Sequence, residues 1–222
     1  MASLKIVLGS ASPRRQLLLS EFGFHFRVIK SDVPEIAPVE LAGGEIAKYI
    51  SMLKSDDLFF KINSDEVLIT ADTIVWIKDK MLGKPKDSKH AIEMLKILSG
   101  QTHSVFTGVT IKSALKTETF CTETQVTFLE LSNETIRRYV DIFMPYDKAG
   151  AYGAQECLPN GMNPYSPEEL NTLHNSASTS SLIGKFTEDS VNSVPLIKQI
   201  NGSYFNVMGL PIVELKTRLG KQ

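Results

Sequence analysis

The chain has 222 residues, 42% of them hydrophobic and 22% charged, and a formal net charge of −1 at pH 7. This length and mixture are typical of a globular protein that buries a full core as one domain, with room for two lobes, and they argue against a disordered chain. The near-neutral charge argues against a broadly basic nucleic-acid surface, although it leaves room for one local basic pocket.

Strands and helices alternate in the first half of the chain. Short apolar runs predict strands, and apolar residues spaced by three and four predict helices. In chain order we expect a strand over Leu4–Leu8, a helix over Pro13–Phe22 that stops near Gly23, a strand over Phe24–Ile29, a helix from about Gly44 to Phe60 and a strand over Val67–Ile77.

The second half continues the alternation and predicts one α/β domain with a mixed sheet. Cap residues mark the helices, and alternation of apolar and polar residues marks the strands. In chain order we expect a helix from Asp87 or Ser88 to Gly100, strands over Val105–Ser113 and Glu118–Phe128 that pair antiparallel, a helix from Ser132 to about Phe143 and a last helix from about Leu210, with Pro211 in its first turn.

Residues 156–199 differ in composition from the rest of the single domain expected over 1–222. They are rich in proline and include the polar run 174–181. A connection of this length is unusual inside a compact domain. We therefore interpret the segment as an insertion, partly mobile, with one short helix near Pro167–Leu173.

Two cysteines, Cys121 and Cys157, cannot form a disulfide framework, so a reduced intracellular protein is the simpler interpretation. The N-terminus lacks the apolar segment of a secretory signal, and no run reaches the length of a membrane span. The expected location is the cytoplasm, with no membrane partner.

The segment between the first strand and the first helix is a candidate anion site. Pro13 suits the first position of a helix, where free backbone N–H groups and the positive end of the dipole attract anions. Ser10 and Ser12 add hydroxyls, and Arg14 and Arg15 add guanidiniums. These groups predict a polyphosphate-binding corner, although a capped helix with two solvated arginines is equally open on this segment alone.

Three further charged residues suggest phosphoryl chemistry. Asp72 lies within a hydrophobic strand, so it needs a cation, a metal or a place at a cleft, unless it only caps a turn. Lys84 follows in a rigid turn, and Glu35 lies in a proline-broken stretch. Together with Arg14 and Arg15 they supply the groups of metal-assisted phosphoryl or nucleotidyl transfer. Glu35 is either a second carboxylate for a divalent metal or a solvated loop acid.

Two other segments offer polar groups. His103 follows a helix stop and could act as a general base, but a lone histidine beside a turn is more often structural, and we favour that interpretation. The small residues of 150–155 let backbone approach a ligand, and Gln155 offers an amide donor and acceptor together.

These segments, in this order, resemble the Maf family of nucleoside triphosphate pyrophosphatases, and the resemblance covers nearly the whole chain except 156–199. It implies a Maf/ITPase-like α/β fold, with a mixed twisted sheet and flanking helices in two lobes around a central cleft. It rests on the motifs Ser10–Arg15, Ala71–Val75, Gly83–Pro85, Leu98–His103, Asp147–Gln155, Ile200–Tyr204 and Val207–Pro211.

The resemblance implies hydrolysis between the α and β phosphates of a nucleotide, giving a monophosphate and pyrophosphate. The dTTP/UTP-cleaving type carries Pro-Arg-Arg, Ala-Asp-Thr and Gly-Ala-Tyr-Gly-x-Gln, and this chain has all three, whereas the 7-methyl-GTP type departs at each. The resemblance therefore makes Arg14, Thr73 and Gln155 specificity positions and Asp72 the proton acceptor. One glutamine amide can accept from N3–H and donate to O4 of uracil or thymine, which would reject bases with the opposite pattern.

For the remaining residues our hypothesis is metal-assisted hydrolysis. Ser10 and Ser12 bind the triphosphate together with Arg14 and Arg15, and Lys84 acts with the arginines to neutralise its charge. The expected cofactor is Mg²⁺, with Mn²⁺ as the alternative, held by Asp72 or Glu35 and by phosphate oxygens. A homodimer is compatible with the family.

The sequence departs from the family pattern in the helix expected over about 44–60. By register, Met52 replaces the usual arginine and Asp57 the usual lysine. Lys54 and Lys61 are candidate substitutes, but neither stands at the matching place. If neither substitutes, the loss of a cation near the triphosphate would weaken catalysis or binding.

Two functions follow from these observations. The leading one is an enzyme that removes dTTP, UTP or modified relatives from the nucleotide pool. The alternative, motivated by Met52 and Asp57, is a regulator of cell division and septum formation that binds nucleotides but turns them over poorly or not at all. A nucleic-acid-binding module is disfavoured because the chain lacks a basic-aromatic face.

Overall fold

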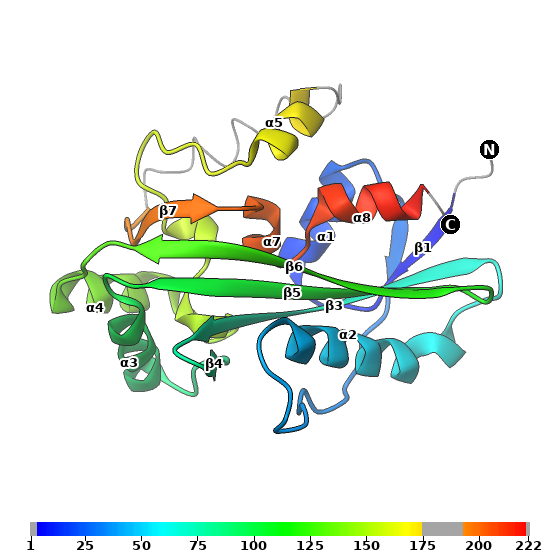
Figure 1. The fold of residues 1–222 in the computed structure, drawn as a ribbon, viewed down its shortest axis with the longest axis horizontal. Helices are drawn as coiled ribbons and strands as arrows, with labels where there is room; N and C mark the ends of the chain where they lie inside the picture. Colours follow the sequence, from blue (N-terminus) through cyan, green and yellow to red (C-terminus); the bar gives the residue numbers. More distant parts are fainter. Residues whose placement is uncertain (1–3, 175–192, 221–222) are drawn as a thin grey trace.

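A long central strand, β3 (Glu66–Ile77), organises the sheet of this protein (Figure 1). The computed structural model describes residues 4–174 and 193–220, and within them seven strands form one mixed sheet in the order β2-β1-β3-β5-β6-β7, with β4 paired to β3 off this path. The other strands are β1 (Lys5–Leu8), β2 (Phe26–Val28), β4 (Lys80–Leu82), β5 (Thr102–Lys112), β6 (Thr117–Phe128) and β7 (Ile197–Asn201).

The register of β3 decides which residues meet at the middle of the sheet. Strand β1 runs parallel to β3, with Leu8 opposite Ile69, so the loop that follows β1 continues along β3 toward Asp72. On its other side β3 pairs antiparallel with β5, which sets Asp72 opposite Gly108. Strands β5, β6 and β7 then complete an antiparallel half.

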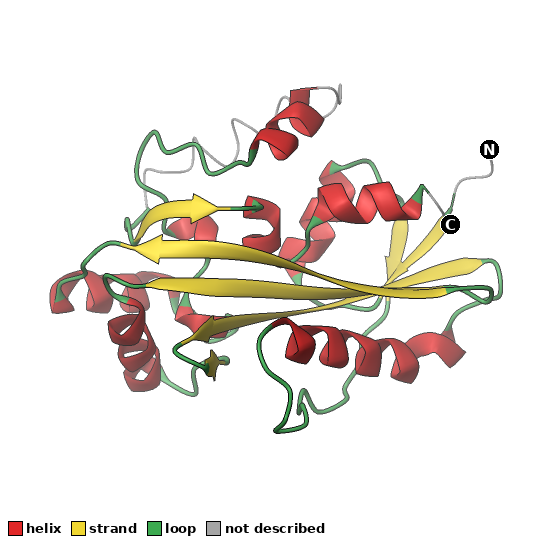
Figure 2. Cartoon of the chain, viewed as in Figure 1, coloured by secondary structure: helices red, strands yellow, loops and turns green. Residues whose placement is uncertain are grey.

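Helices cover both faces of the sheet (Figures 1 and 2). Helix α2 lies on one face, and α1, α7 and α8 lie on the other, while α3 and α4 pack near one end. The helices are α1 (Pro13–Glu21), α2 (Gly44–Leu58), α3 (Ser88–Leu98), α4 (Asn133–Phe143), α5 (Pro167–His174), α7 (Tyr204–Met208) and α8 (Ile212–Leu219), with short 3-10 turns η1 (Phe59–Lys61), η2 (Ala149–Ala151) and η3 (Ala154–Glu156).

Helix α2 approaches the sheet closely at one glycine. A Cβ on residue 108 of β5 would lie 2.3 Å from backbone atoms of Ala47 in α2, which is closer than any real contact. Glycine at this position therefore allows α2 to lie across β3 and β5. The buried face of α2 follows the helical period and includes Ile46, Ile50, Lys54 and Leu58.

The elements predicted from the sequence are confirmed to within a few residues, including the antiparallel pair β5–β6, the cap at Asp87 and the short helix α5. Three short elements were not predicted: β4, β7 and α7. The last helix begins at Ile212, with Pro211 as its N-cap instead of in the first turn.

The segment 156–199, expected as an insertion, lies partly outside the described residues, since 175–192 are not described. Its two ends belong to the main core. Cys157 and Leu196 are fully buried, and the Leu196 N–H donates to the Cys157 carbonyl at 3.0 Å. Strand β7 begins within the segment, at Ile197.

Glu169 of α5 ties the middle of this segment to the start of α7. Its carboxylate is buried and accepts hydrogen bonds from the Ser203 hydroxyl at 2.6 Å and from the backbone N–H groups of Tyr204 and Phe205 at 3.1 and 2.9 Å. A carboxylate at the start of a helix satisfies N–H groups that have no partner within the helix. Glu169 therefore fixes where α7 begins.

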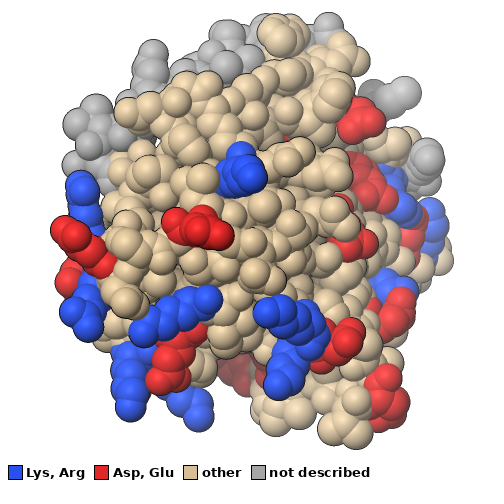
Figure 3. Space-filling model, turned by 60° about the vertical axis from the view of Figure 1, so that its left-hand side comes forward, with Lys and Arg blue, Asp and Glu red and all other residues tan. Residues whose placement is uncertain are grey.

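The molecular surface carries charges of both signs. On the face drawn in Figure 3, lysine and arginine side chains lie next to acidic ones around a largely uncharged centre. Among the described residues no helix combines the length and the apolar character that crossing a membrane requires. Cys121 and Cys157 are both free thiols.

Candidate functional site

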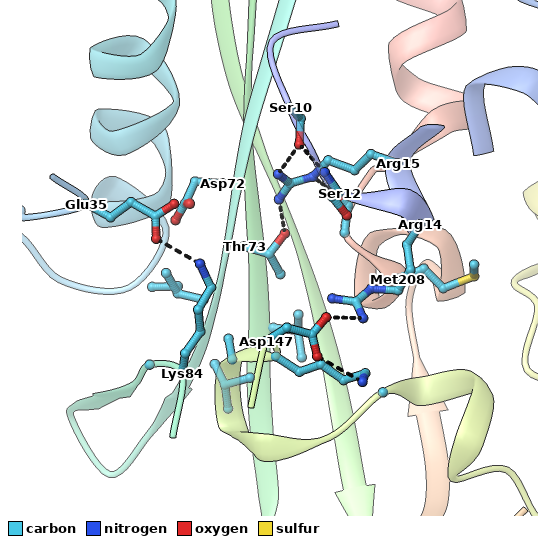
Figure 4. A pocket seen from close by; sticks show the side chains of 18 of the residues that line it. Ser10, Ser12, Arg14, Arg15, Glu35, Asp72, Thr73, Lys84, Asp147 and Met208 are labelled. Carbon is cyan, nitrogen blue, oxygen red and sulfur yellow. Dashed lines mark hydrogen bonds and ion pairs between the residues drawn. The ribbon is translucent and has the colours of Figure 1, made fainter. Parts of the chain in front are cut away.

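A cavity of about 580 Å³ opens where the loop after β1, helix α2 and strand β3 meet the loop 147–155. All nine candidate site residues from the sequence line it, and Figure 4 shows most of them facing one another across the opening. They are Ser10, Ser12, Arg14, Arg15, Glu35, Asp72, Thr73, Lys84 and Gln155.

Gly9 brings the first part of the cavity wall close to β3. Its N–H donates to the Ile69 carbonyl at 2.8 Å, and a Cβ on residue 9 would lie 2.6 Å from Cγ2 of Thr70. The chain then turns through Ser10, whose hydroxyl oxygen accepts from the Ser12 N–H at 3.2 Å, and enters α1 at Pro13. The start of α1 thus faces the cavity, as an anion site requires.

Arg15 is held in a fixed orientation by three elements (Figure 4). Its Nε donates to the Gly209 carbonyl at 2.7 Å, one terminal nitrogen donates to Ser10 Oγ at 3.2 Å, and the other donates to Thr73 Oγ1 at 3.0 Å. Burial lowers the pKa of this guanidinium, and the charge of Asp72 opposes that effect. Because a guanidinium has five N–H donors, two remain for a ligand.

The contact between Arg15 and Gly209 depends on α7, which the sequence reasoning missed. Asn206 of α7 donates through Nδ2 to the Val105 carbonyl and to Thr124 Oγ1, both at 3.0 Å. These bonds hold the short helix on β5 and β6. Helix α7 ends at Met208 and is followed by Gly209, whose φ of 110° is readily adopted only by glycine, and this turn presents the Gly209 carbonyl to Arg15.

A buried lysine joins the two carboxylates of the cavity. Nζ of Lys54 donates to Asp72 Oδ1 at 2.7 Å and lies 2.7 Å from Glu35 Oε1. Lys84 reaches the same group of charges, with Nζ 3.2 Å from Glu35 Oε2 (Figure 4). Two lysines and two carboxylates from four separate segments therefore form one cluster beside the start of α1.

The two carboxylates of this cluster differ in pKa. Burial raises the pKa of Asp72 above its ordinary value, and the neighbouring Lys54 and Arg15 offset only part of this effect. Burial acts on Glu35 in the same direction, but the hydrogen bonds and charges of Lys54 and Lys84 outweigh it and lower the pKa of Glu35. Asp72 is therefore the stronger base of the pair.

Of the two candidate substitutes for the cation that the family pattern places in this helix, Lys54 is the one that lies in the cavity. Lys54 lies on the buried face of α2, one turn beyond Ile50, and its side chain is only 11% exposed. Asp57, taken as the position of the missing lysine, instead accepts a hydrogen bond from the Ser31 hydroxyl at 2.8 Å. Met52 is 43% exposed. The signal in the sequence is the spacing of the apolar residues at 46, 50 and 58, which places residue 54 on the same face of the helix.

The loop 147–155, which carries Gln155 in η3, forms another part of the cavity wall. Gly150 has a φ of 69°, its N–H donates to the Gly83 carbonyl at 3.0 Å, and a Cβ here would lie 2.8 Å from Val75. The backbone N–H of Gly153 donates to the Tyr139 hydroxyl at 2.9 Å. These contacts fix the loop against β3 and α4, so Gln155 has a defined place in the wall.

His103 is placed away from the cavity, in agreement with the structural interpretation favoured for it. Its side chain is 2% exposed, and Nε2 shares a hydrogen bond of 2.8 Å with the Tyr152 hydroxyl. Burial lowers the pKa of His103 to about 3. The imidazole is thus neutral near pH 7 and supports the loop through Tyr152.

The cavity therefore combines two chemically different sets of groups. The start of α1, the cationic side chains and a carboxylate of raised pKa suit a polyphosphate and its hydrolysis. The small-residue backbone and the amide side chain of the loop suit the hydrogen-bonding edge of a planar ring.

Comparison with known proteins gives relatives over nearly the whole length. The family model described as Maf-like protein matches residues 5–160. A dTTP/UTP pyrophosphatase of Bacteroides thetaiotaomicron is 41% identical over 98% of this chain and 95% of the relative, and one of Flavobacterium psychrophilum is 39% identical over 93% and 89%. Among solved structures, the Staphylococcus aureus Ham1 protein matches with a TM-score of 0.43 and 14% identity, covering 57% of this chain and 72% of that one.

Proposed function

Since this chain belongs to the Maf family, we propose that it hydrolyses dTTP and UTP between the α and β phosphates, releasing pyrophosphate and the nucleoside monophosphate. The supporting relatives carry the name dTTP/UTP pyrophosphatase and extend over nearly the full chain. The observation that carries the proposal is one cavity that is lined by Gln155 as well as by Asp72, Lys84 and Arg15. A pyrimidine triphosphate needs both an amide for its base and cationic groups for its phosphates.

The alternative of a nucleotide-binding regulator with little turnover loses its motivation. That interpretation rested on the absence of a cation from α2. Lys54 supplies a positive charge within 2.7 Å of the Asp72 carboxylate. An enzyme that clears dTTP, UTP or modified relatives from the free nucleotide pool is therefore the better account, and we propose the cytoplasm as its location. The expected homodimer stays a prediction.

The donor set of the cavity fits a hard divalent cation such as Mg²⁺, or Mn²⁺ in its place. Asp72 and Glu35 offer carboxylate oxygens, two of which lie 2.7 Å from one positive atom, Lys54 Nζ. The described residues hold no group of three or more Asp, Glu, His or Cys side chains that could bind a metal. Phosphate oxygens of the nucleotide would therefore complete the coordination. The chemistry that a metal supplies here is polarisation of the α-phosphate.

The residues of the chain then divide the reaction between them. Ser10, Ser12 and the start of α1 bind phosphate oxygens, while Arg15 and Lys84 balance the negative charge. Arg14, which pairs with Asp147 in the loop that leads to Gln155, takes part in base selection. Asp72 accepts the proton of the attacking water, which its raised pKa favours. Thr73 contributes by orienting Arg15 through its hydroxyl. Gln155 accepts from N3–H and donates to O4 of the base.

A panel of nucleotides tests this proposal. Purified protein is incubated with dTTP, UTP, dCTP, CTP, dATP, GTP and 7-methyl-GTP in the presence of Mg²⁺, and the products are separated. We expect pyrophosphate and monophosphate from dTTP and UTP, with much slower release from the others. Chelation of the metal should stop release, and Mg²⁺ or Mn²⁺ should restore it.

Two results would contradict the proposal. Release of orthophosphate with a diphosphate product would place cleavage at the wrong bond. Tight binding of dTTP or UTP without any product would favour the alternative function, a nucleotide-binding regulator.

A further inference from the structure

A chain of alternating charges connects Arg14 to the segment that carries Gln155. An Arg14 terminal nitrogen lies 3.5 Å from Asp147 Oδ2, and Asp147 Oδ1 accepts a hydrogen bond from Lys148 Nζ at 3.0 Å (Figure 4). The same Nζ lies 3.3 Å from Glu156 Oε1. Glu156 follows Gln155 directly in η3, so this series of charge pairs connects α1 with the turn that carries Gln155.

Lys148 is the buried centre of this chain of charges. Its side chain is only 10% exposed, whereas that of Asp147 is 63% exposed. Burial alone would raise the pKa of Asp147, but Lys148 and Arg14 outweigh it and lower that pKa, so Asp147 stays ionised. No step of the proposed hydrolysis uses Lys148, which leaves its burial in the cavity wall to be explained.

Glu156 is held on its other side by a buried tyrosine. The Tyr139 hydroxyl donates to Glu156 Oε2 at 2.6 Å and accepts from the Gly153 N–H at 2.9 Å. Burial raises the pKa of Tyr139 well above its ordinary value, so this hydroxyl keeps its proton and remains a donor. Lys148 and Tyr139 therefore fix both oxygens of the carboxylate that follows Gln155.

Fixed placement matters here because a glutamine amide is ambiguous. Rotation of the amide by 180° exchanges its oxygen and nitrogen, so the same side chain can pair with uracil or with cytosine. Uracil and thymine have an acceptor at position 4, whereas cytosine has an amino donor there. A guanidinium only donates. Arg14 held at a set place relative to Gln155 would therefore favour uracil and thymine and repel cytosine.

We propose that Lys148 is a positioning residue for base selection, because by joining Asp147 to Glu156 it sets Arg14 and Gln155 relative to each other. The inference rests on the proposed function and adds a determinant of substrate choice to it. Lys148 makes no contact with the reacting phosphates in this account. Its loss therefore changes the choice between bases more than it changes the rate on the preferred nucleotide.

The test compares kcat/KM for UTP with kcat/KM for CTP in the wild type and in Lys148→Met. Methionine keeps the apolar stem and removes the charge. We expect the UTP-to-CTP ratio to fall about tenfold or more, since sites that read a base edge depend on the placement of their polar groups. Lys148→Arg should restore most of the ratio. Glu156→Gln removes the negative charge that pairs with Lys148, and this variant provides the test if Lys148→Met does not fold.

Lys112→Met is the matched control. Lys112 is also largely buried, at 19% exposure, and is paired with an acid, Asp56, at 2.6 Å, but it does not line the cavity. A UTP-to-CTP ratio unchanged in folded Lys148→Met and Glu156→Gln, or lowered equally in Lys112→Met, would overturn the inference. Wild-type protein that releases no pyrophosphate from any nucleotide would instead refute the proposed function itself, and the two failures are thus distinguishable.

Discussion

The ammonium of Lys54 lies 2.7 Å from Oδ1 of Asp72. The carboxylate that we propose as the base is thus held by a lysine of helix α2, which covers one face of the sheet. The same ammonium lies 2.7 Å from Oε1 of Glu35. A cation at this distance favours the ionised form of Asp72, which is the form that can accept a proton. The lysine therefore acts on the residue that we propose as the proton acceptor, in addition to placing a positive charge in the cavity.

Replacement of Asp72 by asparagine removes the base and keeps the size of the side chain. We expect kcat for dTTP to fall by about 10²–10⁴-fold, because a positioned general base contributes that much to the rate. Binding of dTTP should persist, since the cationic groups remain. Pyrophosphate release gives kcat, and calorimetry gives the affinity. An Asp72→Asn protein with wild-type turnover would remove Asp72 from this role.

The pH dependence of the reaction should report the contact between Lys54 and Asp72. Only the ionised carboxylate accepts a proton, so kcat/KM should rise as the pH increases through the pKa of Asp72. Lys54→Met removes a charge that lowers this pKa. The acidic limb of the profile should therefore move to higher pH.

Lys61→Met is a suitable comparison for Lys54→Met. The side chain of Lys61 lies over the exposed ring of Phe60 and does not line the cavity. Its removal should leave the acidic limb where it is in the wild type. An unchanged limb in Lys54→Met would show that the contact does not set the pKa of the group that limits the reaction at low pH.

Loss of the amide at Gln155 should weaken the preference for dTTP and UTP. Gln155→Leu removes two expected hydrogen bonds to the base, each worth about 0.5–1.5 kcal/mol. We expect kcat/KM for UTP to fall by about 10–100-fold and the values for other nucleotides to fall less. The nucleotide panel measures both. A preserved order of preference in Gln155→Leu would assign base selection to other residues.

The stability of the protein should depend on pH through His103. The folded chain holds the pKa of His103 at about 3, against 6.5 for the ordinary side chain. Between these values the unfolded chain binds a proton that the folded chain does not. The free energy of unfolding therefore falls as the pH is lowered, by at most about 1.4 kcal/mol per pH unit from this group.

A substitution isolates the contribution of His103. Carboxylates also titrate in this range, so the useful quantity is the difference between the wild type and His103→Gln. Denaturant unfolding at several pH values from 7 to 4 should give a flatter dependence for the variant. Parallel curves for the two proteins would show that His103 is protonated as readily in the folded chain as in the unfolded one.

Gly108 provides a test of how the fold positions Lys54. A Cβ at this residue would meet the backbone of Ala47 at 2.3 Å, so Gly108→Ala must push α2 away from the sheet. We expect a loss of about 1–3 kcal/mol in the free energy of unfolding, and lower turnover because Lys54 moves with α2. Gly220→Ala serves as control, since its Cβ would make only ordinary contacts at 3.7 Å. Equal stability of the two variants would contradict the close approach.

The sequence predicted the long elements of the fold because their patterns are periodic and capped. It did not predict β4, β7 and α7, which span three to five residues each and are too short to show a period. They exist because of tertiary contacts. Glu169 satisfies the N–H groups at the start of α7, and Asn206 attaches that helix to the sheet.

The sequence indicated which residues line the candidate site, but it did not indicate which of them contact one another. Motifs indicated Asp72, Lys84 and Gln155, and all three line one cavity. Comparison with the family pattern left Lys54 and Lys61 as equal candidates for the missing cation, and the place of Lys54 on the buried face of α2 is what brings it to Asp72. The bond from Arg15 to the Gly209 carbonyl joins residues 194 positions apart, and no local pattern contains such information.

That last bond has a consequence for the order in which the protein is made. A ribosome produces Arg15 194 positions before Gly209, so nascent protein does not yet have the carbonyl that holds this arginine in place. The emerging polypeptide therefore lacks one part of the cavity wall until residues 207–209 have been made. The cavity is completed late in synthesis, when α7 packs back onto the first helix.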